Sequence, residues 1–169
     1  AYKMMELSFA GRQKIEMVAV DTKELEEKIQ KNTEYLLKPK GISLVTKVGQ
    51  GVIYGDMDLL ESLFLNLVDN ARKACDVDGS IMLEGRNENN GYCFWVKDNG
   101  CGIPESEIKK ITDAFYMVDK SRARKEGGAG IGLALCVKIA HLHNAVFEIK
   151  SKEGCGTQVI LKFRKDRNE

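Results

Sequence analysis

The stretch DLLESLFLNLVDNARKA, from Asp58 to Ala74, carries the clearest periodic pattern in this chain. Its apolar positions form one broad arc, which consists of Leu60, Leu63, Phe64, Leu67, Ala71 and Ala74. This spacing is typical of an amphipathic helix that packs one side on a core. Asp58 and Glu61 have the spacing of a capping box. The sequence therefore predicts a long helix that begins near Asp58.

A polar stripe runs beside the apolar arc of this predicted helix. Ser62, Asn66, Asn70 and Lys73 recur at helical spacing. One interpretation is an ordinary solvated face. The other is that two amides and one ammonium hold a hydrated Mg²⁺ ion and phosphate oxygens, because Mg²⁺ prefers oxygen ligands and keeps several waters. The stripe alone does not decide between the two.

The rest of the chain predicts two more helices and a set of strands. One helix covers residues 21–37, capped by Asp21 or Thr22, and another ends near Leu142, where Asn144 can close it. Apolar runs predict strands at residues 15–20, 42–48, 52–54, 81–86, 92–97, 146–151 and 157–163. We therefore expect an α+β fold, a two-layer sandwich with a mixed, mostly antiparallel sheet and helices on one face.

Composition restricts the classes of function. The 26 Lys and Arg nearly balance the 25 Asp and Glu, so overall charge gives no support to nucleic-acid binding. The 5 cysteines are an odd number without metal-ligand spacing, which favours reduced thiols. No apolar run reaches the roughly 18 residues that a membrane-spanning helix needs. We expect a soluble segment that forms one compact domain.

A carboxylate and two glycines follow the strand predicted at residues 92–97. The sequence Asp98-Asn99-Gly100-Cys101-Gly102-Ile103-Pro104 puts Asp98 at a strand end and the glycines where the backbone turns sharply. A carboxylate there can accept a hydrogen bond from an exocyclic amine, while glycine lets a flat ring approach the main chain. The alternative is a plain Asp-Asn-Gly turn.

A glycine run opens the helix that ends near Leu142. Residues 127–133 read GGAGIGL, and their backbone N–H groups at a helix N-terminus are suited to hold phosphate. The run does not match the dinucleotide-binding fingerprint, because no parallel strand leads into it. It also lacks the Gly-Lys-Ser/Thr ending of the Walker motif. Both common phosphate-binding folds are therefore disfavoured.

In this order, the three motifs resemble the ATPase superfamily shared by histidine kinases, type II topoisomerases, mismatch-repair ATPases and the ninety-kilodalton chaperone. The sequence is most similar to the histidine-kinase branch, over about residues 15–163. The resemblance implies the Bergerat ATP-binding fold, with ATP and Mg²⁺ as cofactors. Small departures are Ala129, where Thr or Ser is common, and Ile131, where Leu is common.

The resemblance also implies a role for each matching residue. Asn70 corresponds to the asparagine that coordinates Mg²⁺, Lys73 to a phosphate-binding base and Asp98 to the adenine-reading aspartate. Asn66, Asn70 and Lys73 are the candidate catalytic residues. The other candidate nucleotide-binding residues are Gly100, Gly102, Ile103, Phe115, Lys120, Arg122, Gly128, Gly130, Ile131, Gly132, Leu133 and Thr157. Phe115 belongs to the segment that begins the family's mobile lid.

The resemblance further implies how the chain is divided. We expect residues 1–11 to be the tail of a dimerisation helix and linker, and residues 12–169 to be the catalytic ATP-binding domain. The phosphoacceptor histidine lies on the dimerisation domain, which is absent from this chain. His141 and His143 lack the Ser-His-Glu context of that acceptor, and we expect ordinary histidines near a helix end.

The implied activity is transfer of the ATP γ-phosphoryl group to that histidine, with a response regulator as a further partner. The expected location is the cytoplasm, either free or as part of a membrane-bound sensor, and nucleic acid is not expected as a ligand. The hydrolysing branches have a glutamate where this chain has Asn66, and a neutral amide cannot act as a general base. A serine kinase of the anti-sigma-factor type and a non-catalytic nucleotide-gated module stay as alternatives.

Overall fold

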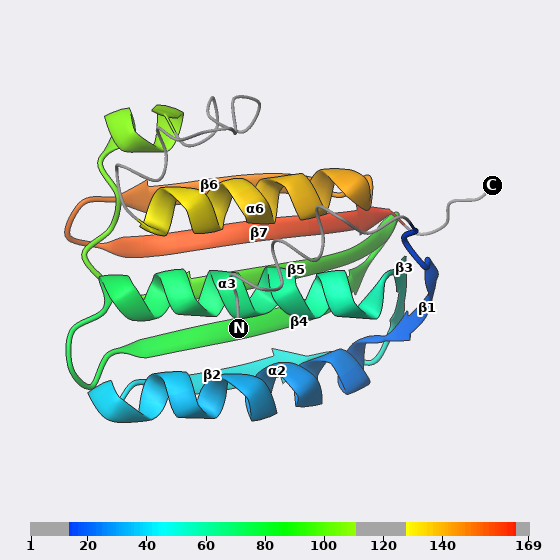
Figure 1. Ribbon diagram of the computed structural model, residues 1–169, viewed down its shortest axis with the longest axis horizontal. Helices are drawn as coiled ribbons and strands as arrows, with labels where there is room; N and C mark the ends of the chain where they lie inside the picture. Colours follow the sequence, from blue (N-terminus) through cyan, green and yellow to red (C-terminus); the bar gives the residue numbers. More distant parts are fainter. Residues whose placement is uncertain (1–13, 111–127, 165–169) are drawn as a thin grey trace.

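The computed structural model describes residues 14–110 and 128–164. Figure 1 shows one layer of helices that covers one face of a sheet, with the helices running roughly along the strands. The elements are β1 (Val18–Asp21), α2 (Thr22–Leu37), the 3-10 helix η1 (Lys38–Lys40), β2 (Ser43–Val48), β3 (Val52–Gly55), α3 (Met57–Ala74), β4 (Ser80–Glu88), β5 (Gly91–Asp98), α6 (Gly128–Leu142), β6 (Val146–Lys152) and β7 (Gly156–Arg164).

The main sheet has five strands in the order β2-β4-β5-β7-β6. β2 and β4 are parallel and the other neighbours are antiparallel. β1 and β3 form a separate antiparallel pair. The α+β two-layer sandwich with a mixed, mostly antiparallel sheet is therefore confirmed. Its one parallel pair exists because the chain crosses from β2 through β3 and α3 before it returns as β4.

The core lies between the sheet and the helices. Phe64 of α3 is fully buried and contacts Phe94 of β5 edge to face, with ring centroids 4.8 Å apart. Phe94 in turn meets Phe163 of β7 at 5.8 Å. A buried Phe that is truncated to Ala typically costs about 3 to 5 kcal/mol of stability. This aromatic row therefore fixes α3 over the centre of the sheet.

The N-terminus of α3 differs from the sequence expectation. The helix begins at Met57, and its cap is Asp56, whose Oδ1 accepts a hydrogen bond from the Leu59 N–H at 3.1 Å. The predicted cap, Asp58, is wrong by two positions. Asp58 lies in the first helical turn instead, where the positive end of the helix dipole stabilises its carboxylate.

α6 begins at Gly128, so the glycine run forms its first turn. The helix ends as predicted, because Asn144 has a φ of 56° and the Ala145 N–H bonds to Ala140 O at 2.9 Å. None of the helices within the described residues combines the length and the apolar character needed to cross a membrane.

Buried polar contacts fasten the helices to the strands at the end of the molecule where β3 leads into α3. His143 is buried; its Nε2 accepts from the Asp56 N–H at 3.1 Å and its Nδ1 lies 2.8 Å from Ile139 O. These partners require the neutral ring with the proton on Nδ1. Burial lowers the pKa of His143. His143 is thus a helix-end residue as expected, but burial and not the helix dipole dominates its titration.

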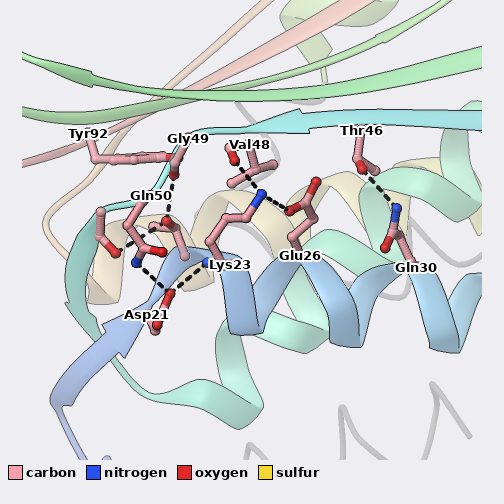
Figure 2. A network of polar contacts seen from close by, with 11 residues as sticks. Asp21, Lys23, Glu26, Gln30, Thr46, Val48, Gly49, Gln50 and Tyr92 are labelled. Atoms are coloured by element: carbon pink, nitrogen blue, oxygen red, sulfur yellow. Dashed lines mark hydrogen bonds and ion pairs between the residues drawn. The ribbon is translucent and has the colours of Figure 1, made fainter.

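Figure 2 shows a second set of contacts, which joins the start of α2 to the turn between β2 and β3. Gly49 O accepts from Thr22 Oγ1 at 2.8 Å and from the Tyr92 hydroxyl at 2.5 Å. Asp21 Oδ1 caps α2 by accepting from the Lys23 N–H at 2.8 Å. The predicted cap at Asp21 is confirmed.

Candidate functional site

Four pieces of the chain meet at the end of the sheet where β5 finishes. They are the C-terminal end of β5, the turn between β6 and β7, the C-terminal end of α3 and the first turn of α6. Figure 1 shows the ends of α3, α6 and the β6–β7 turn together at the left. Asp98 pairs with Thr157 of β7 in register, and Ser151 of β6 also pairs with Thr157.

Asp98 is a half-buried carboxylate that the backbone holds in place. Its Oδ1 accepts from the Gly100 N–H at 2.8 Å, and the Thr157 N–H is a further donor. Burial raises the pKa of Asp98, and these two backbone hydrogen bonds partly oppose the rise. The Thr157 backbone, predicted from the sequence to lie near the site, therefore contacts Asp98 directly.

The loop after Asp98 rests on the end of α3. The Cys101 N–H bonds to Ala74 O at 3.0 Å, and a Cβ on Gly100 would lie 2.6 Å from the same oxygen. Gly102 has a φ of +79°, and a Cβ there would collide with Lys152 O. A side chain at either glycine would push the loop away, so both predicted glycines are required by the packing.

Ser151 is a site residue that the sequence analysis missed. Its Oγ accepts from the Ile103 N–H at 2.7 Å, donates to Gly156 O at 3.0 Å and lies 2.7 Å from Thr157 Oγ1. One hydroxyl therefore joins the loop that contains Ile103 to the β6–β7 hairpin. Its partners are local in the hairpin but 48 positions away in the case of Ile103, so no spacing rule reveals it.

The polar stripe on α3 is not a simple solvated face. Ser62 and Asn66 are buried, and Asn66 Nδ2 donates to Ser62 O at 2.7 Å. α6 packs on this side of α3, where Cys136 Sγ lies 3.6 Å from Leu63 O. Within the described residues, the solvated interpretation therefore fails for these two positions.

Asn70 holds a polar group that lacks a partner. Among the described residues, its Nδ2 is a buried side-chain nitrogen without a hydrogen-bond acceptor. A Cβ on Gly132, in α6, would lie 3.1 Å from both Nδ2 and Oδ1 of Asn70. A buried polar group without a partner costs about 1 to 3 kcal/mol. The amide therefore faces the glycine-rich start of α6 with unused hydrogen-bonding capacity.

Lys73 is exposed, and Asp69 holds it. Lys73 Nζ lies 3.4 Å from Asp69 Oδ2, while Arg72 binds the other oxygen at 2.7 Å. Asp69 is buried and so keeps both cations near one turn of α3. The ammonium of Lys73 is accessible to an anionic ligand on the side of α3 that bears Asn70, one turn earlier.

The first turn of α6 contains Gly128 and Gly130, Gly132 begins the second turn, and Leu133 is buried. The first N–H groups of a helix have no intrahelical acceptor and attract anions. The backbone of Ile131 belongs to this turn. The predicted lid residues Phe115, Lys120 and Arg122 lie outside the described residues.

The donor set suits Mg²⁺ that is bound mainly through phosphate oxygens and water. Asn66 and Asn70 offer amide oxygens, which are hard ligands. No cluster of three His, Cys, Asp or Glu that could hold a metal by itself exists within residues 14–110 and 128–164. The unpaired Nδ2 of Asn70 can donate to a phosphate oxygen of the ligand, and Oδ1 is the atom of the same amide that can face the ion.

A groove between α2 and β2 offers a different location for a ligand. Its volume is about 590 Å³, and it is lined by Glu27, Gln30, Lys31, Thr33, Glu34, Leu37, Lys38, Ile42 and Leu44. Its charges are mixed, and it contains neither a helix N-terminus nor a glycine turn. Its two lysines are offset by two glutamates, and the groove lacks the backbone N–H donors that a glycine turn at a helix start offers to a phosphate.

Comparison with known proteins identifies the family of this chain. Residues 55–167 match the model of the family described as "Histidine kinase-, DNA gyrase B-, and HSP90-like ATPase". A putative sensor protein of Shewanella frigidimarina is 38% identical over 112 residues, which are 66% of this chain and 16% of that protein. The sensor protein kinase WalK of Staphylococcus epidermidis is 35% identical over 126 residues, which are 72% of this chain and 21% of WalK.

Solved structures share the fold. The catalytic domain of histidine kinase ThkA has a TM-score of 0.72 at 22% identity, over 89% of this chain and 97% of that one. Full-length ShkA in complex with AMPPNP has a TM-score of 0.76 at 22% identity, over 99% of this chain and 36% of that one. The chain thus spans a small part of the curated relatives that it matches, 16% and 21% of their lengths.

Proposed function

This chain belongs to the histidine kinase-, DNA gyrase B- and HSP90-like ATPase family, and from that membership we propose that it is the ATP-binding catalytic domain of a sensor histidine kinase. We assign residues 12–169 to the catalytic domain; the expectation that residues 1–11 are the tail of a dimerisation helix and linker lies outside the described residues. The relatives named above are sensor proteins, which does not favour the serine kinase alternative.

One observation carries the proposal: the unpaired amide of Asn70 faces Gly132 at the start of α6, while Ala74 at the end of the same helix holds the loop after Asp98. A nucleotide that lies between α3 and α6 places its phosphates at the α6 N-terminus and its base beside Asp98. The Asp98 carboxylate then accepts from the amino group of adenine, whereas the carbonyl of guanine would repel it.

The residues on α3 position the triphosphate and do not attack it. Asn66 is a neutral, buried amide, so it cannot act as a general base toward water. Lys73 supplies positive charge, and the α6 amides supply donors for phosphate oxygens. When bound, Mg²⁺ neutralises charge on the triphosphate, and Asn70 with Asn66 supplies amide oxygens toward it. This arrangement protects the γ-phosphoryl group until an acceptor is present.

The acceptor is a histidine on a separate dimerisation domain. An imidazole nitrogen there bonds to the γ-phosphorus, the bond from that phosphorus to the β–γ bridging oxygen breaks, ADP leaves, and the imidazole loses its proton. His143 cannot take this role, because it is buried and both of its ring nitrogens are engaged. His141 lies on α6 near its C-terminal end, away from the glycine turn.

The whole protein then passes the phosphoryl group to a response regulator. The catalytic domain works in the cytoplasm, either in a soluble kinase or as the inner part of a membrane-bound sensor.

Transfer of labelled phosphate tests this function. The chain alone, incubated with γ-labelled ATP and Mg²⁺, should stay unlabelled. Addition of the two-helix dimerisation domain of the same parent protein should give a labelled band on that domain. Labelling will be slow, because the effective concentration that a covalent tether provides is lost. The label should be labile in acid and stable in base.

Each of the other possible outcomes would assign a different activity to the chain. An acid-stable label on serine would identify a serine kinase. ATP binding without a labelled product would identify a nucleotide-gated module. Equal labelling of the isolated chain would place the acceptor within it and would contradict the proposal.

A further inference from the structure

A lysine from a distant part of the chain holds the C-terminal end of α3. Lys40 ends η1, and its Nζ donates to Arg72 O at 3.1 Å and to Cys75 O at 2.8 Å. The last four carbonyls of a helix lack intrahelical donors, and a cation there also meets the negative end of the helix dipole. Lys40 is half-buried and therefore caps α3 from outside the helix.

The basic residues of α3 itself are directed elsewhere. Arg72 and Lys73 lie in the last turn, but both pair with Asp69, at 2.7 Å and 3.4 Å. Their charges are thus held one turn before the helix end. The ammonium of Lys40 binds two of the carbonyls at this end.

The carbonyl of Ala74, which directly precedes Cys75, supports the site. Ala74 O accepts from the Cys101 N–H at 3.0 Å, and the backbone of Gly100 lies against it. Asn99 adds a second tie, because its Oδ1 accepts from the Ser80 N–H at 3.0 Å and lies 3.7 Å from Cys75 Sγ. The position of residues 99–101 therefore depends on the last turn of α3.

Lys40 and Asp98 lie close to the same thiol. Burial raises the pKa of Cys75, the negative charge of Asp98 raises it further, and Lys40 opposes the rise. Lys40 thus holds the end of α3 on which the loop after Asp98 rests.

We propose that Lys40 is a positioning residue for the purine: by capping α3 it fixes Ala74 O, and through that oxygen it holds the Gly100–Cys101 backbone where a base can lie beside Asp98. The inference rests on the proposed nucleotide site and assigns to η1 a part in base selection.

The test is nucleotide titration of Lys40→Met and Lys40→Arg in the full chain. In Lys40→Met, ATP affinity should fall about threefold to tenfold, the size of effect expected from one ordinary hydrogen bond, because Lys40 acts through the loop and not on the ligand itself. The ratio of ATP to GTP affinity should fall as well, because a displaced loop no longer presents the base to Asp98. Lys40→Arg should restore most of both, since a guanidinium can donate to two carbonyls.

Lys23→Met is a matched control. Lys23 Nζ also donates to a backbone carbonyl, Val48 O at 3.1 Å, but it does so at the β2–β3 turn shown in Figure 2. This variant should lose some stability and keep both the ATP affinity and the ATP-to-GTP ratio of the parent. If Lys40→Met does not fold, as judged by circular dichroism, Lys40→Gln takes its place.

An unchanged ATP-to-GTP ratio in the folded Lys40 variant would overturn the inference, as would an equal fall in Lys23→Met. Failure of the parent to bind ATP would instead overturn the proposed function, so the two failures are distinguishable.

Discussion

Asp98 is a half-buried carboxyl, and burial disfavours its ionised form. Burial raises the pKa of this carboxyl above its ordinary value, although two backbone N–H groups partly stabilise the ionised form. When the pKa of a carboxyl is higher in the folded state than in the unfolded chain, the folded protein loses stability as the pH rises through that folded pKa. At neutral pH the ionised Asp98 therefore costs the nucleotide-free protein stability. A residue kept at such a cost is typical of a binding site.

Asp98→Asn should consequently raise the free energy of unfolding of the nucleotide-free protein at neutral pH, because it removes the desolvated charge. The same change should weaken ATP binding by about tenfold, since an acceptor for the adenine amino group is lost or misoriented. Denaturant melts and calorimetric titration measure the two effects. Reduced stability together with unchanged ATP affinity would remove Asp98 from the base site.

Asn70→Ala should abolish most of the Mg²⁺-dependent part of ATP binding, an effect of about tenfold. It should not destabilise the free protein through the Nδ2 group, because that buried nitrogen has no acceptor among the described residues. Titrations with and without Mg²⁺ measure the effect. Asn87→Ala is the control, because that side chain donates to Gln50 O at the far end of the sheet. Equal Mg²⁺ dependence in the parent and in Asn70→Ala would contradict the assignment.

At the scale of elements, His143 joins the end of α6 to the start of α3. Burial lowers its pKa below the ordinary 6.5, while Asp56 and Ile139 O oppose this. The unfolded chain then binds a proton more readily than the folded protein, so stability should fall as the pH drops below about 6.5. Protonation also removes the acceptor of the Asp56 N–H.

Thermal melts between pH 7.5 and roughly pH 5.5 check this expectation in the range where histidine titrates. His143→Gln should flatten the pH dependence of the melting temperature, because an amide can accept from the Asp56 N–H and donate to Ile139 O without titrating. His141→Gln is the control at an exposed position of the same helix. A parent curve that is flat over this range, or that His141→Gln flattens equally, would show that His143 is not the group responsible.

Most elements could be predicted from the sequence because their signals are local. The apolar arc of α3 and the Asn144 ending of α6 both depend on residues within a few positions. The turn between β4 and β5 consists of Asn89 and Asn90, because Glu88 pairs with Gly91. The candidate site residues could be proposed because Asn70, Asp98 and the glycine run recur as an ordered set in a known family.

The residues that the sequence analysis missed either contact distant parts of the chain or compete with a neighbouring residue for the same cap position. Asp56 caps α3 in place of Asp58, because Asp56 also accepts from the Glu16 N–H of the neighbouring strand region and so gains a second partner. Lys40 and Ser151 act on backbone groups more than thirty positions away. A single sequence has no signal for such pairs.

At the scale of the whole molecule, the two ends differ in chemistry. One end gathers the C-terminus of α3, the start of α6, Asp98 and the β6–β7 turn, while the other is closed by the contacts of Thr22, Tyr92 and His143 (Figures 1 and 2). The account requires nucleotide at the first end. The groove between α2 and β2 is the location that would contradict it.

Backbone amide NMR spectra of the full chain, recorded with and without Mg²⁺ and a non-hydrolysable ATP analogue, test this claim most directly. The account predicts the largest shifts at Asn70, Gly132, residues 98–102 and residues 154–157, and little change at the start of α2. Shifts centred on Gln30, Thr33 and Leu44, with residues 98–102 unchanged, would contradict it.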